Sequence, residues 1–251
     1  MLLISQEFKA IYLHNPKVAG TYLKKILIKY YKFTNYNNFH NKKTIEDHEI
    51  FAENSNIDKL IISKEKKFNS FTCQFRKKGI YRYFEDIIKR EEYKDFFKFT
   101  FVRNPYTKII SAWKYSNTYS KENDFYYKDS EEIHQDDYEF DEYLKEAKET
   151  CTDYAYFHSF ITQTDHLINS ENKIDFDFIG KLENLKEDLI TVLTKLNIKD
   201  HIHLETNEGL IPLNLGMKTK PNSYYLTKEN INIINNYFKD DFINFNYEFK
   251  E

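Results

Sequence analysis

The chain of 251 residues contains few of the residues that interrupt or crosslink a fold: five glycines, four prolines and two cysteines. Cys73 and Cys151 form no CxxC pair, so neither a disulfide framework nor a thiolate zinc site is indicated. The opening apolar run, residues 1–5, meets Gln6 and Glu7 too soon for a signal peptide or a membrane span. We therefore expect a soluble, cytoplasmic protein with no integral membrane segment.

The chain also lacks a strong net charge. Its 37 Lys and Arg residues stand against 40 Asp and Glu residues, which gives a formal net charge of −3. Without a global basic field, no nucleic-acid partner is expected, and any anion site has to be local. The 41% hydrophobic and 18% aromatic content excludes a disordered chain, and the length suits one core, so we predict a single domain over residues 1–251.

Short apolar runs alternate with helical patterns along the chain. Residues 10–14 (AIYLH) form a strand-like run, and residues 21–31 carry apolar side chains at helical spacing. Residues 97–102 (FKFTFV) are aromatic and β-branched, and an Asn-Pro pair separates them from a helical pattern over residues 106–115. This alternation predicts an α/β fold in which a parallel sheet is flanked by helices on both faces. The remaining predicted elements are strands over residues 59–63 and 174–181, helices over residues 80–90, 140–150, 185–196 and 227–238, and a loop over residues 121–141.

The loop after the first strand-like run has the composition of an anion-binding turn. Residues 14–21 (HNPKVAGT) join that run to the first helix. Free N–H groups at a helix start, a glycine that lets an anion approach the backbone, a lysine and a threonine hydroxyl can together hold an oxyanion. Lys17 precedes the turn, whereas the lysine of a GxxxxGK[ST] loop follows it, so ATP hydrolysis is disfavoured. Taken alone, the loop could equally be an ordinary glycine-containing turn with an exposed lysine.

A second candidate anion site follows residues 97–102. Arg103, at the end of this predicted strand, would point a forked cation into the crevice where α/β sheets bind ligands. Ser111, about two helical turns further on, could add a hydroxyl. The alternative is an arginine paired with a carboxylate and a serine on the helix surface.

Together, the two loops resemble those of the sulfotransferases that use 3′-phosphoadenosine-5′-phosphosulfate (PAPS), especially the carbohydrate sulfotransferases that include chondroitin and heparan enzymes. The family's PKxAGT/S loop reads PKVAGTY at residues 16–22, and its FVRNPxxRxxSAW-like segment reads FVRNPYTKIISAW at residues 101–113. The resemblance implies that the first loop holds the 5′-phosphosulfate and the second the 3′-phosphate. Lys218 and Lys220 lie in a tail that approaches the 3′-phosphate in relatives, so the resemblance implies a contact with this phosphate. The alternative is that both are solvated surface lysines. The co-substrate-binding residues that the resemblance implies are Pro16, Lys17, Ala19, Gly20, Thr21, Tyr22, Arg103, Ser111, Lys218 and Lys220.

Three further segments match the family in order, from about residue 11 to residue 249 in all. Residues 158–163 (HSFITQ) resemble its HxxPQ stretch, with Thr162 where proline is usual. Residues 178–185 (FIGKLENL) resemble its FIGRFENL turn, and residues 214–247 resemble its C-terminal segment. The resemblance therefore covers almost the whole chain and implies a P-loop-like sulfotransferase fold.

Two departures from the family pattern affect the chemistry. Lys108 replaces the usual arginine, which keeps the charge but loses bidentate geometry. The histidine that many relatives carry before the second loop is absent from the comparable stretch, residues 69–72. We place the general base at His158, which the resemblance puts near the acceptor, and next at His48. The other candidates are His14, His40 and Glu183.

The sequence thus predicts a sulfotransferase that moves a sulfuryl group from PAPS to a carbohydrate hydroxyl, with Lys17 stabilising charge on the leaving oxygen. The acceptor would be a polysaccharide, an oligosaccharide or a glycolipid. Lysine and arginine can neutralise the phosphates, so no metal is expected, and His201 and His203 lack a convincing third ligand. Two other functions stay open: a small kinase-like phosphotransferase, and a protein that binds the nucleotide without transfer.

Overall fold

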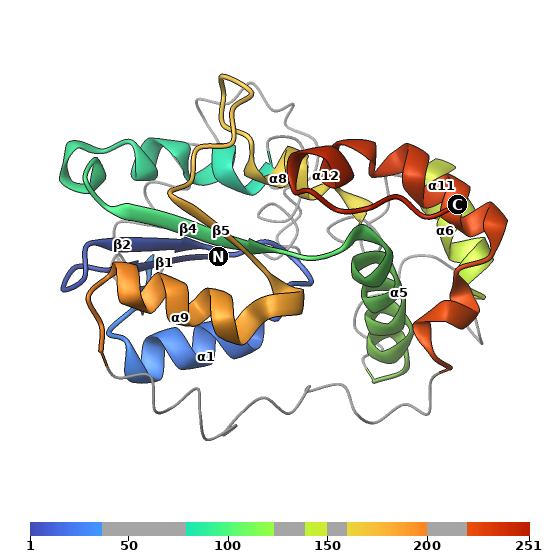
Figure 1. The fold of residues 1–251 in the computed structure, drawn as a ribbon, viewed down its shortest axis with the longest axis horizontal. Helices are drawn as coiled ribbons and strands as arrows, with labels where there is room; N and C mark the ends of the chain where they lie inside the picture. Colours follow the sequence, from blue (N-terminus) through green and yellow to red (C-terminus); the bar gives the residue numbers. More distant parts are fainter. Residues whose placement is uncertain (37–78, 123–138, 150–159, 200–219) are drawn as a thin grey trace, which may run out of the picture.

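The computed structural model describes residues 1–36, 79–122, 139–149, 160–199 and 220–251. These residues form a five-stranded sheet with helices on both faces and a group of further helices beside it (Figure 1). The predicted α/β fold is confirmed. In the order β3-β1-β2-β4-β5, the strands are β1 (Leu2–Ser5), β2 (Ala10–Leu13), β3 (Thr34–Asn35), β4 (Phe97–Val102) and β5 (Phe178–Lys181).

The sheet is mixed. β2, β4 and β5 run parallel, whereas β1 pairs antiparallel with both β2 and β3. The predicted parallel strands are confirmed, and the sheet also has an antiparallel edge that was not predicted, because residues 6–9 form a turn too short for the crossover that parallel neighbours need. All four side chains of β1 are buried, so the opening apolar run is part of the core.

The parallel strands end at one edge of the sheet. Tyr12 of β2 and Phe178 of β5 both lie opposite Phe99 of β4, and Val102 lies opposite Lys181. The loops that follow β2, β4 and β5 therefore leave the sheet side by side. This is the edge at which α/β sheets bind their ligands.

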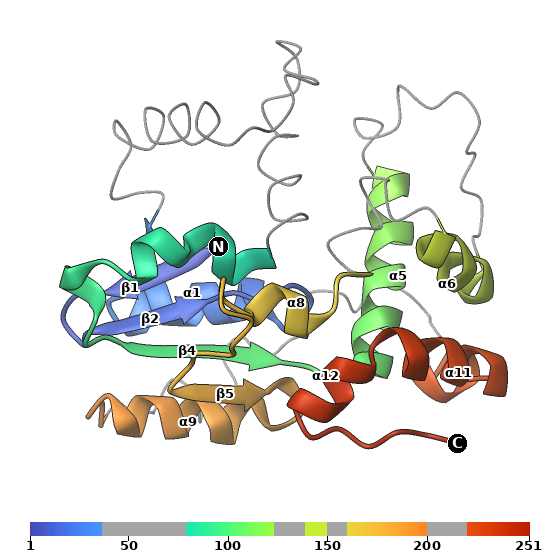
Figure 2. The ribbon, with the colours of Figure 1, turned by 90° about the horizontal axis from the view of Figure 1, so that it is seen from above.

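Helices cover both faces of the sheet. α1 (Gly20–Tyr30) and α9 (Leu185–Lys195) pack on the face to which Tyr12 and Phe99 point. A helix over residues 79–88 packs on the opposite face, against the side chains that point the other way from β1 and β2. Figures 1 and 2 show the helices on the two faces of the sheet, viewed from directions at right angles. Alternating side chains of β1, β2, β4 and β5 thus contribute to two separate cores.

The remaining helices gather beyond the end of β4 (Figures 1 and 2). Their core contains Trp113, the only tryptophan of the chain, whose ring lies 5.6 Å from that of Phe140 and 4.9 Å from that of Tyr225. The helices of this group are α5 (Pro105–Glu122), α6 (Phe140–Glu149), α8 (Gln163–Leu167), α11 (Lys228–Tyr237), α12 (Lys239–Asn244) and the short η3 (Asn222–Tyr225). Two further single turns, η1 (Glu91–Tyr93) and η2 (Leu182–Asn184), connect elements of the sheet half.

Most predicted elements are confirmed, with changes at their ends. α5 continues to Glu122, into residues predicted as loop, and α12 was not predicted. The strand predicted from residue 174 begins only at Phe178, because Ile174 forms just an isolated bridge to Ile168. The predicted strand over residues 59–63 and most of the loop predicted over residues 121–141 lie outside the described residues.

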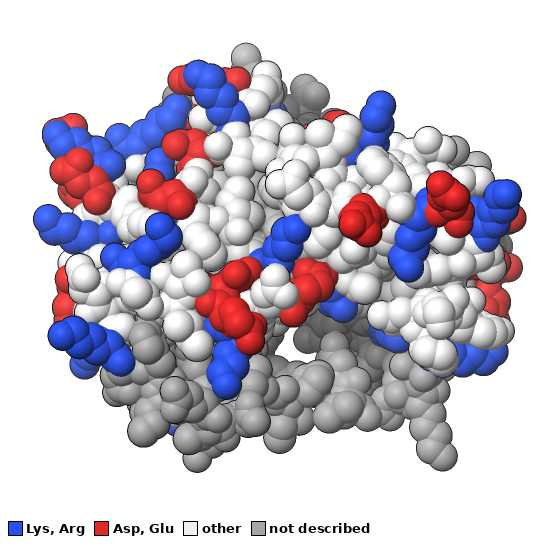
Figure 3. Space-filling model, viewed as in Figure 1, with Lys and Arg blue, Asp and Glu red and all other residues white. Residues whose placement is uncertain are grey.

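Charged side chains of both signs are spread over the face shown in Figure 3, with no single sign dominating it. This agrees with the nearly balanced charge of the sequence. Among the described residues, no helix has both the length and the apolar character needed to cross a membrane.

Candidate active site

The backbone of the first loop is shaped to receive an anion. Between β2 and α1, Lys17 and Ala19 adopt φ angles of 64° and 55°, a region that residues other than glycine adopt rarely. Such left-handed residues turn neighbouring N–H groups toward one concave point. Ala19 caps α1 without a side-chain bond, and the first turn of the helix carries no acidic residue. The positive end of the helix dipole therefore faces the loop without a carboxylate from its own first turn.

Gly20 is required by the close approach of His14. A Cβ atom on Gly20 would lie 1.9 Å from Cε1 of the His14 ring. Nδ1 of the same ring lies 3.4 Å from the hydroxyl of Tyr12. His14, one of the candidate bases, therefore packs against the start of α1 and supports the loop.

Arg103 connects the two candidate anion loops. It follows β4 directly, and its Nη1 donates a hydrogen bond to the carbonyl oxygen of Lys17 at 3.2 Å. Its Nε donates to Thr107 Oγ1 at 2.9 Å, and this hydroxyl donates to the carbonyl oxygen of Asn104 at 3.1 Å. The guanidinium is thus fixed within its own loop while it reaches the other. The two loops that the sequence predicted separately meet at one edge of the sheet.

Positive charge is concentrated where the loops meet. Burial, together with the charges of Arg103 and Lys108, lowers the pKa of Lys17 to about 7. Burial lowers the pKa of Lys108 to about 8, although Asp241 and Asp165 oppose this shift. A bound anion would stabilise the charged forms of such mutually repelling cations. The donor set therefore fits a ligand with several negative charges.

Sequence comparison agrees with this geometry. The model of the sulfotransferase family matches residues 1–248. The chain belongs to the sulfotransferase family. No curated protein and no solved structure is significantly similar to it. The protein is thus a transferase of sulfuryl groups.

The sulfotransferase places the predicted residues of its first loop at the start of α1. Thr21 is exposed in the first turn, and Tyr22 packs partly against the core beneath α1. Burial raises the pKa of the Tyr22 hydroxyl, which keeps it a hydrogen-bond donor. The half-buried members of this predicted set are Pro16, Lys17, Ala19 and Gly20.

One face of α5 continues the site from Arg103. Thr107, Ser111 and Lys114 are half-buried, whereas Ile110 between them is buried. Steps of four and three residues place these side chains in one row on the helix. Ser111 therefore lies in the row that begins with Thr107, the residue whose hydroxyl accepts from Arg103 Nε.

Lys114 is a further candidate site residue, which the sequence did not predict. Burial and the nearby charge of Arg103 lower its pKa. Its Nζ donates to Asn222 Oδ1 at 3.3 Å and lies 5.4 Å from the centroid of the Tyr225 ring. The signal that could have found it is its position one helical turn after Ser111.

The C-terminal segment of the sulfotransferase approaches this row through η3. Lys220 precedes η3, and its Nζ lies 3.6 Å from the centroid of the exposed Tyr224 ring. Asn222 of η3 accepts the hydrogen bond from Lys114. Lys220 therefore belongs to the segment that borders the α5 row, and Lys218 lies outside the described residues.

Glu183, a candidate base, anchors the second loop. Its Oε1 accepts a hydrogen bond from the backbone N–H of Asn104 at 2.8 Å, and its Oε2 accepts one from the Tyr247 hydroxyl at 2.9 Å. Burial and the charge of Glu183 raise the pKa of Tyr247, so its hydroxyl stays protonated as a donor. Both carboxylate oxygens thus hold structural contacts.

The two histidines preferred as the base lie outside the described residues. These are His158 and His48, and the same is true of His40, His201 and His203. Within the described part of the chain, no group of three His, Cys, Asp or Glu side chains is arranged to hold a metal ion.

Proposed function

We propose that this sulfotransferase transfers the sulfuryl group of PAPS to a hydroxyl of a carbohydrate and releases adenosine 3′,5′-bisphosphate. The observation that supports PAPS most directly is the hydrogen bond from Arg103 to the backbone of Lys17, which joins two cationic loops. PAPS carries a phosphosulfate at the 5′ position and a phosphate at the 3′ position of one ribose. Such a donor needs two anion sites within the length of a nucleoside.

Each loop would hold one anionic group. The N–H groups at the start of α1, together with Lys17 and Thr21, would bind the 5′-phosphosulfate. Arg103 and Ser111 would bind the 3′-phosphate, and Lys220 borders the same face of α5. Lys17 and Arg103 also supply the positive charge that the phosphates require.

Lys17 has the central role in the transfer step. The acceptor oxygen attacks sulfur in line while the bond between sulfur and the bridging phosphate oxygen breaks. Negative charge then grows on the bridging oxygen, and the ammonium of Lys17 stabilises it in the transition state. A base takes the proton of the acceptor hydroxyl, for which we propose His158, with His48 as the second candidate. The products are a sulfate ester and adenosine 3′,5′-bisphosphate.

The carbohydrate acceptor is proposed from the resemblance of PKVAGTY and FVRNPYTKIISAW to the motifs of carbohydrate sulfotransferases. Polysaccharides, oligosaccharides and glycolipids are the candidate classes. In α/β enzymes, loops around the ligand edge of the sheet set the choice among acceptors.

Incubation with sulfur-labelled PAPS and a panel of glycans tests the proposal. We expect label on one class of glycan, adenosine 3′,5′-bisphosphate in equal amount, and loss of both in the Lys17→Met variant. Calorimetric titration with adenosine 3′,5′-bisphosphate and with ATP accompanies the assay. Preferential binding of ATP would contradict the proposal in favour of a phosphotransferase, and bisphosphate binding without transfer to any acceptor would indicate a binding protein.

A further inference from the structure

The side-chain amide of Gln163 forms two hydrogen bonds with the backbone of Arg103. Gln163 Oε1 accepts a hydrogen bond from the Arg103 N–H at 2.8 Å, and its Nε2 donates to the Arg103 carbonyl oxygen at 2.8 Å. This double pairing fixes the orientation of the amide, because only one orientation sets a donor against an acceptor at both positions. The peptide groups on both sides of the Arg103 Cα atom are thus held by one side chain.

The same amide oxygen also holds the first loop. Gln163 Oε1 accepts a second hydrogen bond, from Asn15 Nδ2 at 3.1 Å. Asn15 Nδ2 also donates to the carbonyl oxygen of Phe101 in β4 at 3.3 Å. Asn15 is fully buried and lies two residues before Lys17. One buried atom therefore connects the loop that carries Lys17 with the loop that carries Arg103.

Gln163 is the first residue of α8, and the start of this helix is held by hydrogen bonds. Asp241 Oδ2 accepts from the backbone N–H of Gln163 at 2.8 Å, and Asp241 Oδ1 accepts from that of Thr164 at 2.7 Å. Thr162 caps the helix by accepting from the N–H of Asp165 at 3.0 Å. Gln163 and Asp241 are both fully buried, so the surrounding protein determines where this amide lies.

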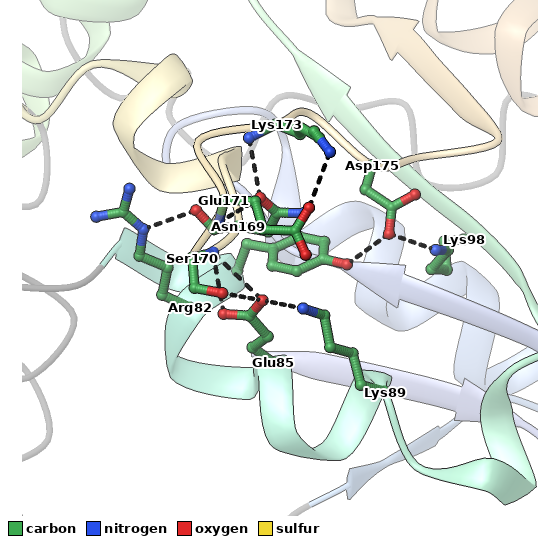
Figure 4. Close-up of polar contacts among 10 residues, drawn as sticks. Arg82, Glu85, Lys89, Lys98, Asn169, Ser170, Glu171, Lys173 and Asp175 are labelled. Carbon is green, nitrogen blue, oxygen red and sulfur yellow. Dashed lines mark hydrogen bonds and ion pairs between the residues drawn. The ribbon is translucent and has the colours of Figure 1, made fainter.

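The segment that follows α8 is fixed by hydrogen bonds to the helix over residues 79–88. Figure 4 shows the polar contacts there: Glu85 accepts from the backbone N–H of Ser170 at 3.1 Å and from its hydroxyl at 2.8 Å, and Arg82 Nε donates to the carbonyl oxygen of Asn169 at 2.9 Å. Gly79, with a φ of 73°, fits against α8 because a Cβ atom would lie 2.0 Å from the carbonyl oxygen of Asp165. α8 is thus a rigid support for Gln163.

We infer that Gln163 is a positioning residue that keeps the two phosphate-binding loops in register, so that Lys17 and Arg103 meet the two ends of one nucleotide at the same time. The inference rests on the proposed function. Gln163 is not a catalytic residue, because its amide atoms bond to Arg103, Asn15 and Asp241. It acts through the two cations and not on the nucleotide.

If Gln163 sets the position of the two loops relative to each other, its replacement should change nucleotide affinities in a pattern that a general loss of structure does not produce. A ligand that reaches both loops gains affinity only when both can be engaged together, whereas a ligand that reaches one loop does not sense their register. Adenosine 3′,5′-bisphosphate reaches both loops. Adenosine 5′-monophosphate and adenosine 3′-monophosphate each reach only one.

The test is calorimetric titration of the full chain with these three nucleotides, for wild type and for Gln163→Met, which keeps the side-chain length and removes both polar atoms. We expect the variant to lose about tenfold or more in affinity for the bisphosphate and less than about threefold for either monophosphate. Asn15→Ala should show the same pattern, and the double variant should lose little more than Gln163→Met alone. Equal losses for all three nucleotides, or an unchanged bisphosphate affinity, would overturn the inference.

Lys173→Ala is the control, because Lys173 is exposed and pairs with Glu171 beyond α8 without touching Gln163, Arg103 or Asn15. It should bind the bisphosphate as wild type does, and a loss equal to that of Gln163→Met would overturn the inference. If Gln163→Met does not fold, Gln163→Glu gives the answer. Its carboxyl group beside Asp241 can donate to the Arg103 carbonyl only when protonated, so its bisphosphate affinity relative to wild type should recover as the pH is lowered. A ratio that stays constant with pH would contradict the role.

These measurements separate the inference from the proposed function. If wild type binds the bisphosphate no more tightly than either monophosphate, the proposed function fails. If wild type prefers the bisphosphate and Arg103→Ala removes that preference while Gln163→Met does not, only the inference fails.

Discussion

Lys17 illustrates how a single residue can be costly in the free protein and useful in the complex. Its folded-state pKa of about 7 lies below the ordinary value of 10.5. Between these values the unfolded chain binds more protons than the folded one, so the stability of the ligand-free protein rises with pH across this range. At neutral pH the buried ammonium therefore lowers stability, and it becomes favourable only when an anion lies beside it.

We expect Lys17→Met to lose about a hundredfold or more in turnover, because the lost charge is needed mainly in the transition state. The same variant should be at least as stable as wild type in urea unfolding at neutral pH without ligand, since it removes a buried charge. The two measurements together separate loss of chemistry from loss of fold. Turnover close to that of wild type would show that Lys17 does not contact the leaving oxygen.

The affinity for adenosine 3′,5′-bisphosphate should fall as the pH rises above about 7, because free Lys17 loses its proton there and the bound anion restores it. The slope should approach about tenfold per pH unit, and the phosphates, with second pKa values of about 6, are already ionised in this range. Lys108 also has a lowered pKa, but its Nζ donates to the carbonyl oxygen of Ile161 at 2.6 Å. Titrations in two buffers of different ionisation enthalpy measure the proton uptake. In Lys17→Met the uptake should shrink, and an unchanged uptake would assign it to another group.

At the scale of elements, α5 acts as a support for one row of side chains. Thr107, Ser111 and Lys114 follow one another along its half-buried face, which begins just after Arg103, while the opposite face is buried in the helical group. The strand–loop–helix unit thus carries cationic side chains both in its loop and on one face of its helix. A side chain on the helix, such as that of Lys114, can therefore add a contact to the ones that the loop supplies.

We expect Lys114→Ala to weaken the binding of adenosine 3′,5′-bisphosphate by roughly tenfold, the usual worth of one charged hydrogen bond. The affinity for adenosine 5′-monophosphate should stay near that of wild type, and Arg103→Ala and Ser111→Ala should show the same contrast. Lys145→Ala is the control, because Lys145 lies in the same helical group but is exposed and pairs with Glu229 at 3.3 Å. Equal loss for both nucleotides would mean that Lys114 does not act on the 3′-phosphate.

Long elements with a clear pattern could be predicted from the sequence, and short elements that depend on distant partners could not. FKFTFV matches β4 residue for residue, because β-branched and aromatic side chains with a following proline leave little choice. β1 has only four residues, and only its pairing with β2 and β3 identifies it as a strand. α8 has five residues and depends on Asp241, 78 residues away from Gln163 in sequence.

The same distinction applies to the candidate site. The two loops carry their signals in adjacent residues, so Lys17, Arg103 and Ser111 could be proposed from the sequence alone. Gln163 could be recognised only as the end of a matched stretch, because its role depends on which backbone it meets. The sequence does not distinguish Lys114 from a surface lysine, because its contact with Asn222 depends on the fold.

At the scale of the whole molecule, the C-terminal tail joins the sheet to the helical group. Lys181 in β5 donates to the carbonyl oxygen of Asn246 at 2.9 Å, and its Nζ lies 4.4 Å from the centroid of the Tyr247 ring. A few residues later, the backbone N–H of Lys250 donates to the hydroxyl of Tyr106 in α5 at 2.7 Å. The tail therefore bridges the two halves on either side of the second loop.

Tyr247→Phe should lower the free energy of unfolding by about 0.5 to 1.5 kcal/mol, because it removes the hydrogen bond to Glu183 and keeps the ring contact. Urea unfolding measures the change, and Tyr224→Phe, at an exposed ring, should leave stability unaltered. Unchanged stability in Tyr247→Phe would show that the tail contributes little through this contact.

The position of Trp113 gives the molecule a built-in optical reporter. Because it is the only tryptophan, its fluorescence comes from one place, the core of the helical group, where its ring contacts Phe140 of α6 and Tyr225 of η3. Tyr225 also lies under Lys114, so a nucleotide that draws Lys114 away changes the surroundings of the fluorophore. We therefore expect emission to report unfolding of the helical group and, under the proposed function, nucleotide binding at the α5 row, while the sheet, which carries no tryptophan, contributes only tyrosine emission.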